Sequence, residues 1–136
     1  MMSALSIGLS GMRAAEARLE VSANNVANVR SAGAIPTEAP AEPGAEAAPV
    51  YKPQRVENRE APGGGVSTRI VSDTSFQAVY DADASYADKD GMVAEPKIDL
   101  AREAVEQISA QVQFSANLKT VQSAITMSQQ LLSLRA

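Results

Sequence analysis

Apolar residues recur at helical spacing through the last third of the chain. Residues 99–134 contain no Pro or Gly, and Asp99 stands where an N-cap is wanted. We therefore predict one helix over this range, about 54 Å long at 1.5 Å per residue. Glu103 and Glu106 lie near its positive end and Arg135 near its negative end, which suits the helix dipole.

Two apolar stripes run along this predicted helix in different directions. The longer stripe keeps the alternating spacing of a heptad seam, with Ser128 in one gap, and consists of Phe114, Leu118, Val121, Ile125 and Leu132. The upstream stripe lies about a third of a turn away and consists of Val105, Ile108 and Val112. A helix packed on a single partner needs one stripe. Two stripes favour several helical neighbours, some from other chains; loose patterning in a small bundle is the alternative.

The first residues predict a second long helix, from an N-cap at Ser3 to about Asn28. Its main apolar face consists of Leu5, Leu9, Met12, Leu19, Ala23 and Val26, interrupted by Glu16. A weaker stripe on the opposite side consists of Ile7, Ala14 and Val21. Gly8 and Gly11 each cost roughly 1 kcal/mol relative to Ala inside a helix. They indicate either a frayed terminus or a close approach of another helix, and the sequence does not separate these interpretations.

Asn24, Asn25 and Asn28 gather at the end of this helix. Asn tolerates left-handed conformations and bonds nearby backbone groups, so it serves poorly inside a helix and well at its end. We interpret the cluster as a C-terminal cap, with Gly33 as a later helix breaker.

The middle of the chain predicts a linker followed by a small β region. Residues 32–49 are rich in Ala, Pro and Glu and favour a solvated, largely disordered linker. Short extended candidates at 50–52 and 54–56 precede a turn at 62–65, and residues 66–71 and 75–80 alternate at period two. A hairpin or a three-stranded patch fits, which is too small to be stable without the helices or another subunit.

Residues 81–96 are acidic and are predicted to be irregular. Their aspartates invite comparison with a calcium-binding EF-hand loop. With Asp88 and Asp90 at the third and fifth ligand positions, the first ligand falls on Tyr86 and the required Glu falls on Lys97. The pattern fails, and a solvated acidic turn ending at Gly91 is the better account.

Composition narrows the function classes. The 136 residues are 45% hydrophobic but only 4% aromatic, which favours thin helical contacts over a thick core. The net charge of −4 argues against nucleic acid, since phosphate binding needs a basic face. The chain has no Cys and no His, and it shows no catalytic pair or phosphate-binding loop. We therefore predict a non-enzyme with no metal or cofactor and no small-molecule substrate.

No targeting or membrane segment is evident. Met1 to Leu9 contains no Lys or Arg and no apolar h-region, unlike a Sec-type signal peptide. No stretch approaches the ~20 apolar residues of a membrane span.

Motifs at both ends resemble one family. Residues 10–12 and 19–28, Ser-Gly-Met and Leu-Glu-Val-Ser-Ala-Asn-Asn-Val-Ala-Asn, resemble the N-terminal signature of the axial proteins of the bacterial flagellum. Residues 87–93, 96–99 and 114–118, together with Leu132-Ser133-Leu134, are similar to the small proximal-rod type of that family, FlgC.

The resemblance implies a structural role in motility. Such proteins are exported by the flagellar type III apparatus without a cleaved signal, and they build the periplasmic rod of the basal body. The expected partners are other rod subunits, neighbouring copies of itself and the export apparatus. The implied fold is mainly α: long N- and C-terminal helices packed as a coiled-coil-like pair, with a small β-hairpin region and an acidic loop between them. The expected segments are 1–31, 32–49, 50–98 and 99–136.

The resemblance also gives an expected assembly interface on the two terminal helices. Its residues are Leu5, Leu9, Met12, Leu19, Asn24, Asn25, Val26, Asn28, Val105, Ile108, Val112, Phe114, Asn117, Leu118, Val121, Ile125 and Leu132. Leu5, Met12, Leu19 and Val26 are expected to face the seam of the C-terminal helix, with Ile125 at its centre. A small helical adaptor or chaperone of a type III secretion system is the alternative.

Overall fold

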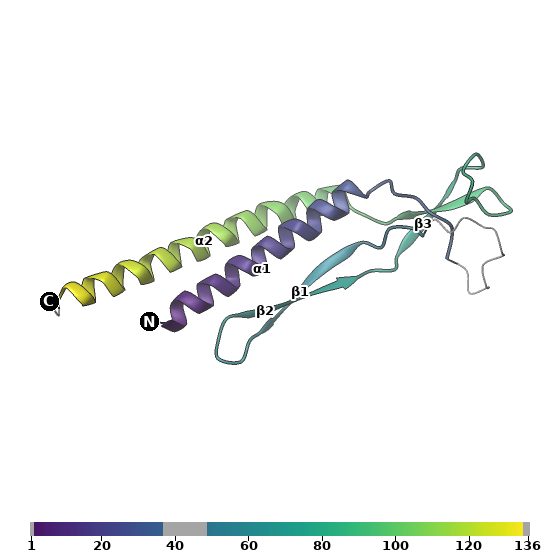
Figure 1. The fold of residues 1–136 in the computed structure, drawn as a ribbon. Helices are drawn as coiled ribbons and strands as arrows, with labels where there is room; N and C mark the ends of the chain where they lie inside the picture. Colours follow the sequence, from purple (N-terminus) through teal and green to yellow (C-terminus); the bar gives the residue numbers. More distant parts are fainter. Residues whose placement is uncertain (1, 37–48, 135–136) are drawn as a thin grey trace.

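Two long helices lie side by side, with two small β-hairpins beside and beyond them (Figure 1). The computed structural model describes residues 2–36 and 49–134. Within these residues the elements are α1 (Met2–Ala27), β1 (Gln54–Glu60), β2 (Val66–Ser72), β3 (Phe76–Tyr80), β4 (Met92–Pro96) and α2 (Leu100–Ser133). The expected linker at 37–48 and the expected role of Arg135 lie outside the described residues.

The helix predicted for the C-terminal third is confirmed, including its cap. The Asp99 side chain accepts hydrogen bonds from the backbone N–H groups of Ala101 at 2.9 Å and Arg102 at 3.2 Å. These are two of the four donors that the first turn of a helix leaves unpaired. Glu103 lies in the same turn, where its negative charge suits the helix dipole.

The start of α1 differs from the prediction, because the helix begins at Met2 and Ser3 lies within it rather than at a cap. At its other end the cap prediction holds for the side chain of Asn28, while Asn24 contributes only its backbone carbonyl. The backbone N–H and the side-chain amide of Asn28 both donate to the Asn24 carbonyl, at 3.1 and 2.9 Å. Ser31 then donates to the Asn28 side chain at 3.0 Å.

The two helices run antiparallel and approach closely through small residues. A Cβ atom added at Gly8 would lie 2.6 Å from Cγ2 of Val121, and one added at Gly11 would lie 2.5 Å from Oδ1 of Asn117. Both distances are below any real contact, so the glycines let α2 approach, and a frayed terminus is not needed to explain them. Ala15, midway along α1, is 1% exposed.

The residues that fill this contact agree only in part with those predicted from the apolar stripes. Leu9, Leu19 and Val26 are exposed, whereas Ala14 and Val21 of the weaker stripe are buried. On α2 the partly or fully buried line is Glu103, Gln107, Ala110, Phe114, Asn117, Val121, Ala124 and Ser128. It shares Phe114 and Val121 with the predicted seam, whereas Ile125 lies one residue to the side of Ala124 and Leu132 lies beyond the end of the line. The physical reason is distance, since helices this close have room for Gly and Ala between them but not for two layers of Leu.

The helix α2, with 34 residues, is longer than α1, with 26. Both chain termini lie at the same end of the molecule, where α2 extends beyond the start of α1 (Figure 1). Leu131, Leu132 and Leu134 in this extension are 48%, 70% and 82% exposed.

The first hairpin lies along α1. Strands β1 and β2 pair antiparallel from Gln54↔Ser72 to Glu60↔Val66. The predicted turn at 62–65 is confirmed, and Gly63, Gly64 and Gly65 have φ angles of 91°, 95° and 90°. The backbone N–H of Val66 donates to the Ser10 hydroxyl at 3.1 Å, which fixes the tip of the hairpin on α1. The extended candidate at 50–52 is not a strand.

The second hairpin corrects the prediction that 81–96 is irregular throughout. Strands β3 and β4 pair antiparallel from Phe76↔Pro96 to Tyr80↔Met92. Val93 and Ala94 in β4 are 1% and 0% exposed, among the most deeply buried residues that the structure describes. Gly33 exchanges two backbone hydrogen bonds with Ala94, at 2.9 and 2.8 Å, so the expected linker is ordered at its start.

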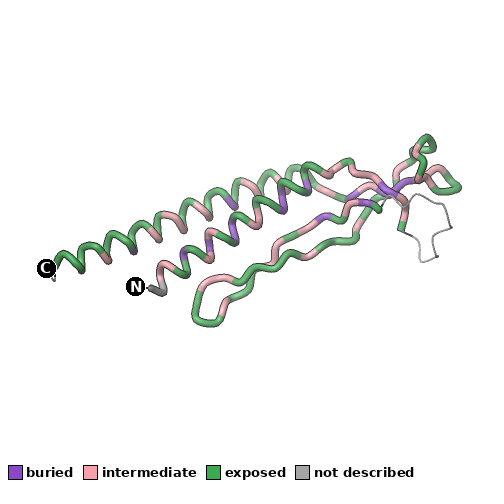
Figure 2. The backbone as a smooth tube through the Cα atoms, viewed as in Figure 1, coloured by how far each residue is buried: buried purple, intermediate pink, exposed green. Residues whose placement is uncertain are grey.

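The core is thin and divided. Figure 2 shows buried positions along α1 and near the second hairpin, while most of α2 is exposed or half-buried. Among the described residues, no helix is long and apolar enough to span a membrane.

Candidate functional site: a polar hub and two exposed apolar faces

Asn25 is the centre of a polar hub that joins three parts of the fold. Its side-chain amide donates to the Gln54 carbonyl at 2.8 Å and to Oε1 of Glu103 at 2.9 Å. Its Oδ1 atom accepts from the Gln54 backbone N–H at 2.9 Å and from the Tyr51 hydroxyl at 3.1 Å. Asn25 is 2% exposed, and all four of its hydrogen-bonding positions are used. The cap expected from the sequence is therefore wrong for Asn25, which joins α1 to the start of β1 and to the first turn of α2.

Ser22 and Tyr51 complete the hub. The Ser22 hydroxyl is buried and donates to the backbone carbonyl of Glu103 at 3.1 Å, one helical turn before Asn25. Burial raises the pKa of the Tyr51 hydroxyl above its ordinary value, and the nearby Glu103 carboxylate raises it further. Both effects keep Tyr51 protonated, as its donation to Asn25 requires.

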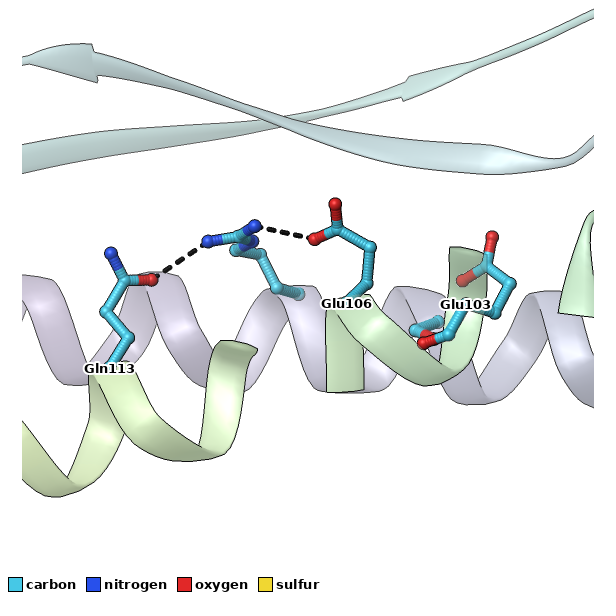
Figure 3. Close-up of polar contacts among 5 residues, drawn as sticks. Glu103, Glu106 and Gln113 are labelled. Carbon is cyan, nitrogen blue, oxygen red and sulfur yellow. Dashed lines mark hydrogen bonds and ion pairs between the residues drawn. The ribbon is translucent and has the colours of Figure 1, made fainter. Parts of the chain in front are cut away.

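Arg18 holds the helices together farther along their contact. Its guanidinium donates to Oε2 of Glu106 at 2.6 Å and to the side-chain carbonyl of Gln113 at 3.0 Å. Figure 3 shows Glu106 and Gln113 pointing from α2 to the same guanidinium, on the side that faces the hairpin strands. The ion pair is partly exposed, so it orients the helices more than it stabilises them.

Large apolar side chains remain on two other faces. On α1, Leu9, Leu19 and Val26 are exposed, at 45%, 47% and 37%, while Ile7, at 40%, lies on the side of the hairpin turn. Leu5 and Met12 of the same stripe as Leu9 are half-buried. We call the stripe of Leu5, Leu9, Met12, Leu19 and Val26 the leucine face. At about 100° per residue, their mean direction lies roughly 70° from the direction of Gly8, Gly11 and Ala15 towards α2, on the side away from the hairpin.

The second apolar surface lies on α2. Val105, Ile108 and Val112 are 61%, 62% and 64% exposed. We call these three residues the outer stripe. Their direction is nearly opposite to the line of α2 that contacts α1, so nothing in the described part of a single copy covers them. The two-direction pattern predicted for this helix is thus present in the structure.

The remaining predicted interface residues fall into four groups. Asn25 belongs to the hub, and Asn24 and Asn28 to the helix cap. Asn117 and Val121 lie against the two glycines of α1, with Phe114 and Leu118 half-buried nearby. Ile125 and Leu132 are 43% and 70% exposed, and the buried position beside Ile125 is Ala124.

Sequence reasoning missed several residues of the helix contact. Gly8, Gly11, Ala15 and Ser22 follow one another at spacings of three, four and seven, and so form a small-residue line on one side of α1. That spacing was available from the sequence, but a search for large apolar residues passes over it. Arg18 and Glu103 had no comparable signal, since their partners lie 78 to 95 residues away.

The acidic connection between β3 and β4 is held by hydrogen bonds from its backbone N–H groups to one of its own side chains. Oδ1 of Asp88 accepts from the backbone N–H groups of Asp90 at 2.9 Å and Met92 at 2.8 Å. Gly91 has a φ of 74°, which closes the turn. Within the described residues, no group of three or more acidic side chains is placed to hold a metal ion.

Comparisons with known proteins agree on one family. Residues 5–34 match the family model described as flagella basal body rod protein. Residues 89–134 match the model described as flagellar basal body rod FlgEFG protein C-terminal. The chain is 35% identical over 118 residues to the flagellar basal-body rod protein FlgC of Aquifex aeolicus (strain VF5), covering 85% of this chain and 83% of that protein.

Proposed function

Because this chain belongs to the flagellar basal-body rod proteins of the FlgC type, we propose that it is a subunit of the proximal rod, which assembles through its two terminal helices. In this role it forms part of the axial shaft that transmits rotation for bacterial motility. The proposal includes export through the flagellar type III apparatus without a cleaved signal, and a place in the periplasmic part of the basal body.

The observation that supports the proposal is the position of the large apolar side chains. Val105, Ile108 and Val112 form a stripe in which each residue is more than half exposed, and Leu9 and Leu19 are nearly half exposed on another face. Contiguous apolar surface of this kind marks a contact with another molecule. A subunit that is surrounded by neighbours needs such surface in more than one direction, as the two faces of this molecule provide.

The hub gives the subunit a fixed shape for that contact. Asn25, Ser22 and Arg18 bond α1 to α2, and Ser10 bonds the hairpin tip to α1. An assembly that carries torque needs subunits whose helices do not slide past one another. Directed hydrogen bonds between buried groups supply this, because apolar contact alone is non-directional.

The alternative of a type III adaptor or chaperone is not favoured by the family matches. A chaperone would be a stable folded dimer when purified, whereas a rod subunit waiting for assembly would be a monomer. A sedimentation measurement on the purified protein distinguishes them.

The direct test is complementation of a strain that lacks this chain. The unmodified chain is expected to restore swimming and to be present in isolated basal bodies. Ile108→Asp is expected to abolish both while leaving expression and helix content unchanged, because Ile108 is 62% exposed in one copy and its substitution disturbs no internal contact. Thr120→Asp, at an exposed site about a third of a turn away, is the matched control. Absence of the unmodified chain from isolated basal bodies would overturn the proposal.

A further inference from the structure

We propose that the leucine face of one copy packs antiparallel on the outer side of α2 of a second copy, with Glu16 of one copy against Lys119 of the other. This inference rests on the proposed rod function and goes further, because it names the two surfaces that meet and their register.

The outer side of α2 has a hollow that can receive a side chain of a neighbouring helix; below, such a four-residue site is called a receptor. A shallow hollow is lined by Lys119, Gln122, Ser123, Thr126 and Met127. The first four stand at positions i, i+3, i+4 and i+7, which is the arrangement of the four residues that receive one side chain in a coiled coil. Ser123 is small, so the hollow has room at its centre.

The hollow continues the line of the outer stripe. Seven residues before it, Val112, Ser115, Ala116 and Lys119 form a second set with the same spacing. Seven residues earlier again, Val105, Ile108, Ser109 and Val112 form a third. The rim of each set is partly apolar, and a small residue, Ser or Ala, lies at its centre. The outer side of α2 therefore offers three consecutive receptors at heptad spacing.

The leucine face has the matching set of side chains. Met12, Leu19 and Val26 are also seven residues apart, and they are accessible on the side of α1 that faces away from the hairpin. With the helices antiparallel and Met12 in the hollow, Leu19 falls on the second set and Val26 on the third. Met is flexible enough to fill a hollow whose rim is partly polar.

The charges fit the same register. Glu16 interrupts the leucine face, and Lys119 follows the outer stripe one heptad after Val112. Both side chains are exposed, and neither takes part in the ion pairs Arg18–Glu106 and Arg55–Glu57 of the described part of the chain. An isolated carboxylate would oppose burial of the leucine face. In the register set by Met12 and the hollow, Glu16 lies opposite Lys119, so each charge meets its opposite.

The antiparallel direction follows from the fold. The helices α1 and α2 are antiparallel within each copy, as the contacts of Gly8 with Val121 and Gly11 with Asn117 require. Copies that point the same way along a shaft therefore place α1 antiparallel to the α2 of a neighbour. The proposed register is displaced by about six or seven residues from the internal one, which moves the second copy by about 10 Å along the helix axis.

A second copy is the occupant that explains both surfaces together. One chain provides the three side chains, the three receptors and both charges. The contact is heterologous, because each copy uses its leucine face on one neighbour and keeps its outer stripe for another. Contacts of this kind repeat without closing and build a helical array.

Disulfide cross-linking tests the register directly, because the chain has no cysteine of its own. Met12→Cys combined with Ser123→Cys is produced in the strain that lacks the chain, and isolated basal bodies are oxidised. Within one copy these positions are displaced by about 10 Å along the axis and point apart, so they cannot bridge. We expect dimers and higher multiples of this chain on a non-reducing gel. Arg13→Cys with Ser123→Cys is the control, since Arg13 is exposed but points elsewhere, and it is expected to give about tenfold less product.

The outcomes separate this inference from the proposed function. Basal bodies that contain the chain with both Met12→Cys and Ser123→Cys but give no more cross-linked product than the control would overturn the register. A product whose mass matches a different subunit would overturn the choice of a second copy. In both results the rod function stands, whereas it fails if the unmodified chain is absent from basal bodies.

Charge exchange provides an independent test. Glu16→Lys and Lys119→Glu are each expected to reduce the rate of spreading in soft agar about fivefold, because each places like charges face to face. The double variant restores the opposite pair and is expected to regain more than half of the original rate. A double variant no better than the poorer single one, or single variants that spread normally, would show that the two residues do not meet.

Discussion

The inner contact between α1 and α2 and the outer faces of the same helices are built from opposite kinds of residue. The inner contact uses Gly8, Gly11, Ala15 and Ala124, together with the polar Asn25. The outer faces carry Leu, Ile and Val that are more than a third exposed. In a self-sufficient helical protein the large apolar residues would be inside. The inversion teaches that the fold of one copy is fixed largely by close approach and hydrogen bonds, and that many of its large apolar side chains are left exposed.

The largest effect on one copy is expected from Asn25→Ala. The Asn25 side chain is the common hydrogen-bond partner of the backbone N–H and carbonyl of Gln54, the Tyr51 hydroxyl and the Glu103 carboxylate. The substitution removes this partner from all four groups. Each unsatisfied buried group costs about 1–3 kcal/mol, so the free energy of unfolding should fall by about 3–5 kcal/mol. Urea unfolding followed by circular dichroism measures it.

Asn24→Ala is the control for this change, because Asn24 is exposed and contributes its backbone carbonyl to the cap. It is expected to alter the free energy of unfolding by less than about 0.5 kcal/mol. Equal losses for the two alanine variants would mean that the hub does not hold the inner contact.

Two adjacent residues on α2 provide the next test of the difference between the inner contact and the outer faces. Ala124 is 7% exposed in the inner contact, whereas Ile125 is 43% exposed. Ala124→Asp should lower the free energy of unfolding by about 2–3 kcal/mol, since it takes a carboxylate out of water without a partner. Ile125→Asp should lower it by less than about 1 kcal/mol and should reduce swimming instead. If Ile125→Asp destabilised the purified protein as much as Ala124→Asp, the sequence-based seam would be the true contact.

A smaller loss is expected from Gly8→Val. The new Cβ would lie 2.6 Å from Cγ2 of Val121, a stiff β-branched side chain, so the helices must move apart. Overpacking of this kind costs about 1–3 kcal/mol. Leu9→Ala, at the next residue on the exposed face, should leave the unfolding transition almost unchanged. A Gly8→Val protein as stable as the original would indicate that the helices are not in close contact there.

The smallest expected effect concerns pH. The pKa of Tyr51 is raised above 10.0 by burial and by Glu103, so the folded protein holds this proton more tightly than the unfolded chain does. The stability that comes from the proton is therefore complete below about pH 10 and is lost as the pH rises through the raised pKa. The original protein should lose more stability than Tyr51→Phe when urea unfolding is repeated between about pH 9 and pH 11. A difference between the two proteins that does not change over this range would rule out the titration of Tyr51 as the cause.

The elements that the sequence predicted well are those with a continuous local signal. The helix α2 and its Asp99 cap follow from an uninterrupted run of helix-forming residues, and the turn at 62–65 follows from three glycines. Strand β4 was missed, because five residues beside an acidic stretch give little pattern. Its burial depends on pairing with β3 and on a bridge from Gly33, which is distant in the sequence.

The candidate site was predicted in part, for a related reason. Apolar periodicity correctly indicated two faces on α2, but it could not say which face a single copy uses. That choice depends on the distance between the helices, which Gly8 and Gly11 set and which a hydrophobicity scale ignores. The role of Asn25 was out of reach, because its four hydrogen bonds lead to residues 26 to 78 positions away.

The order of the elements also sets the timing of folding. The helix α1 is formed by the first residues, and its helical partner α2 by the last. Val121 fills the space beside Gly8, and most of the chain lies between these two residues in the sequence. The hairpin of β1 and β2 also contacts α1 and comes earlier in the chain, but the contact with α2 needs almost the whole length. A helix with two glycines is weak on its own, so α1 depends on these later partners for its stability. The inner contact therefore joins the two ends of the chain, and contacts between such distant residues slow folding.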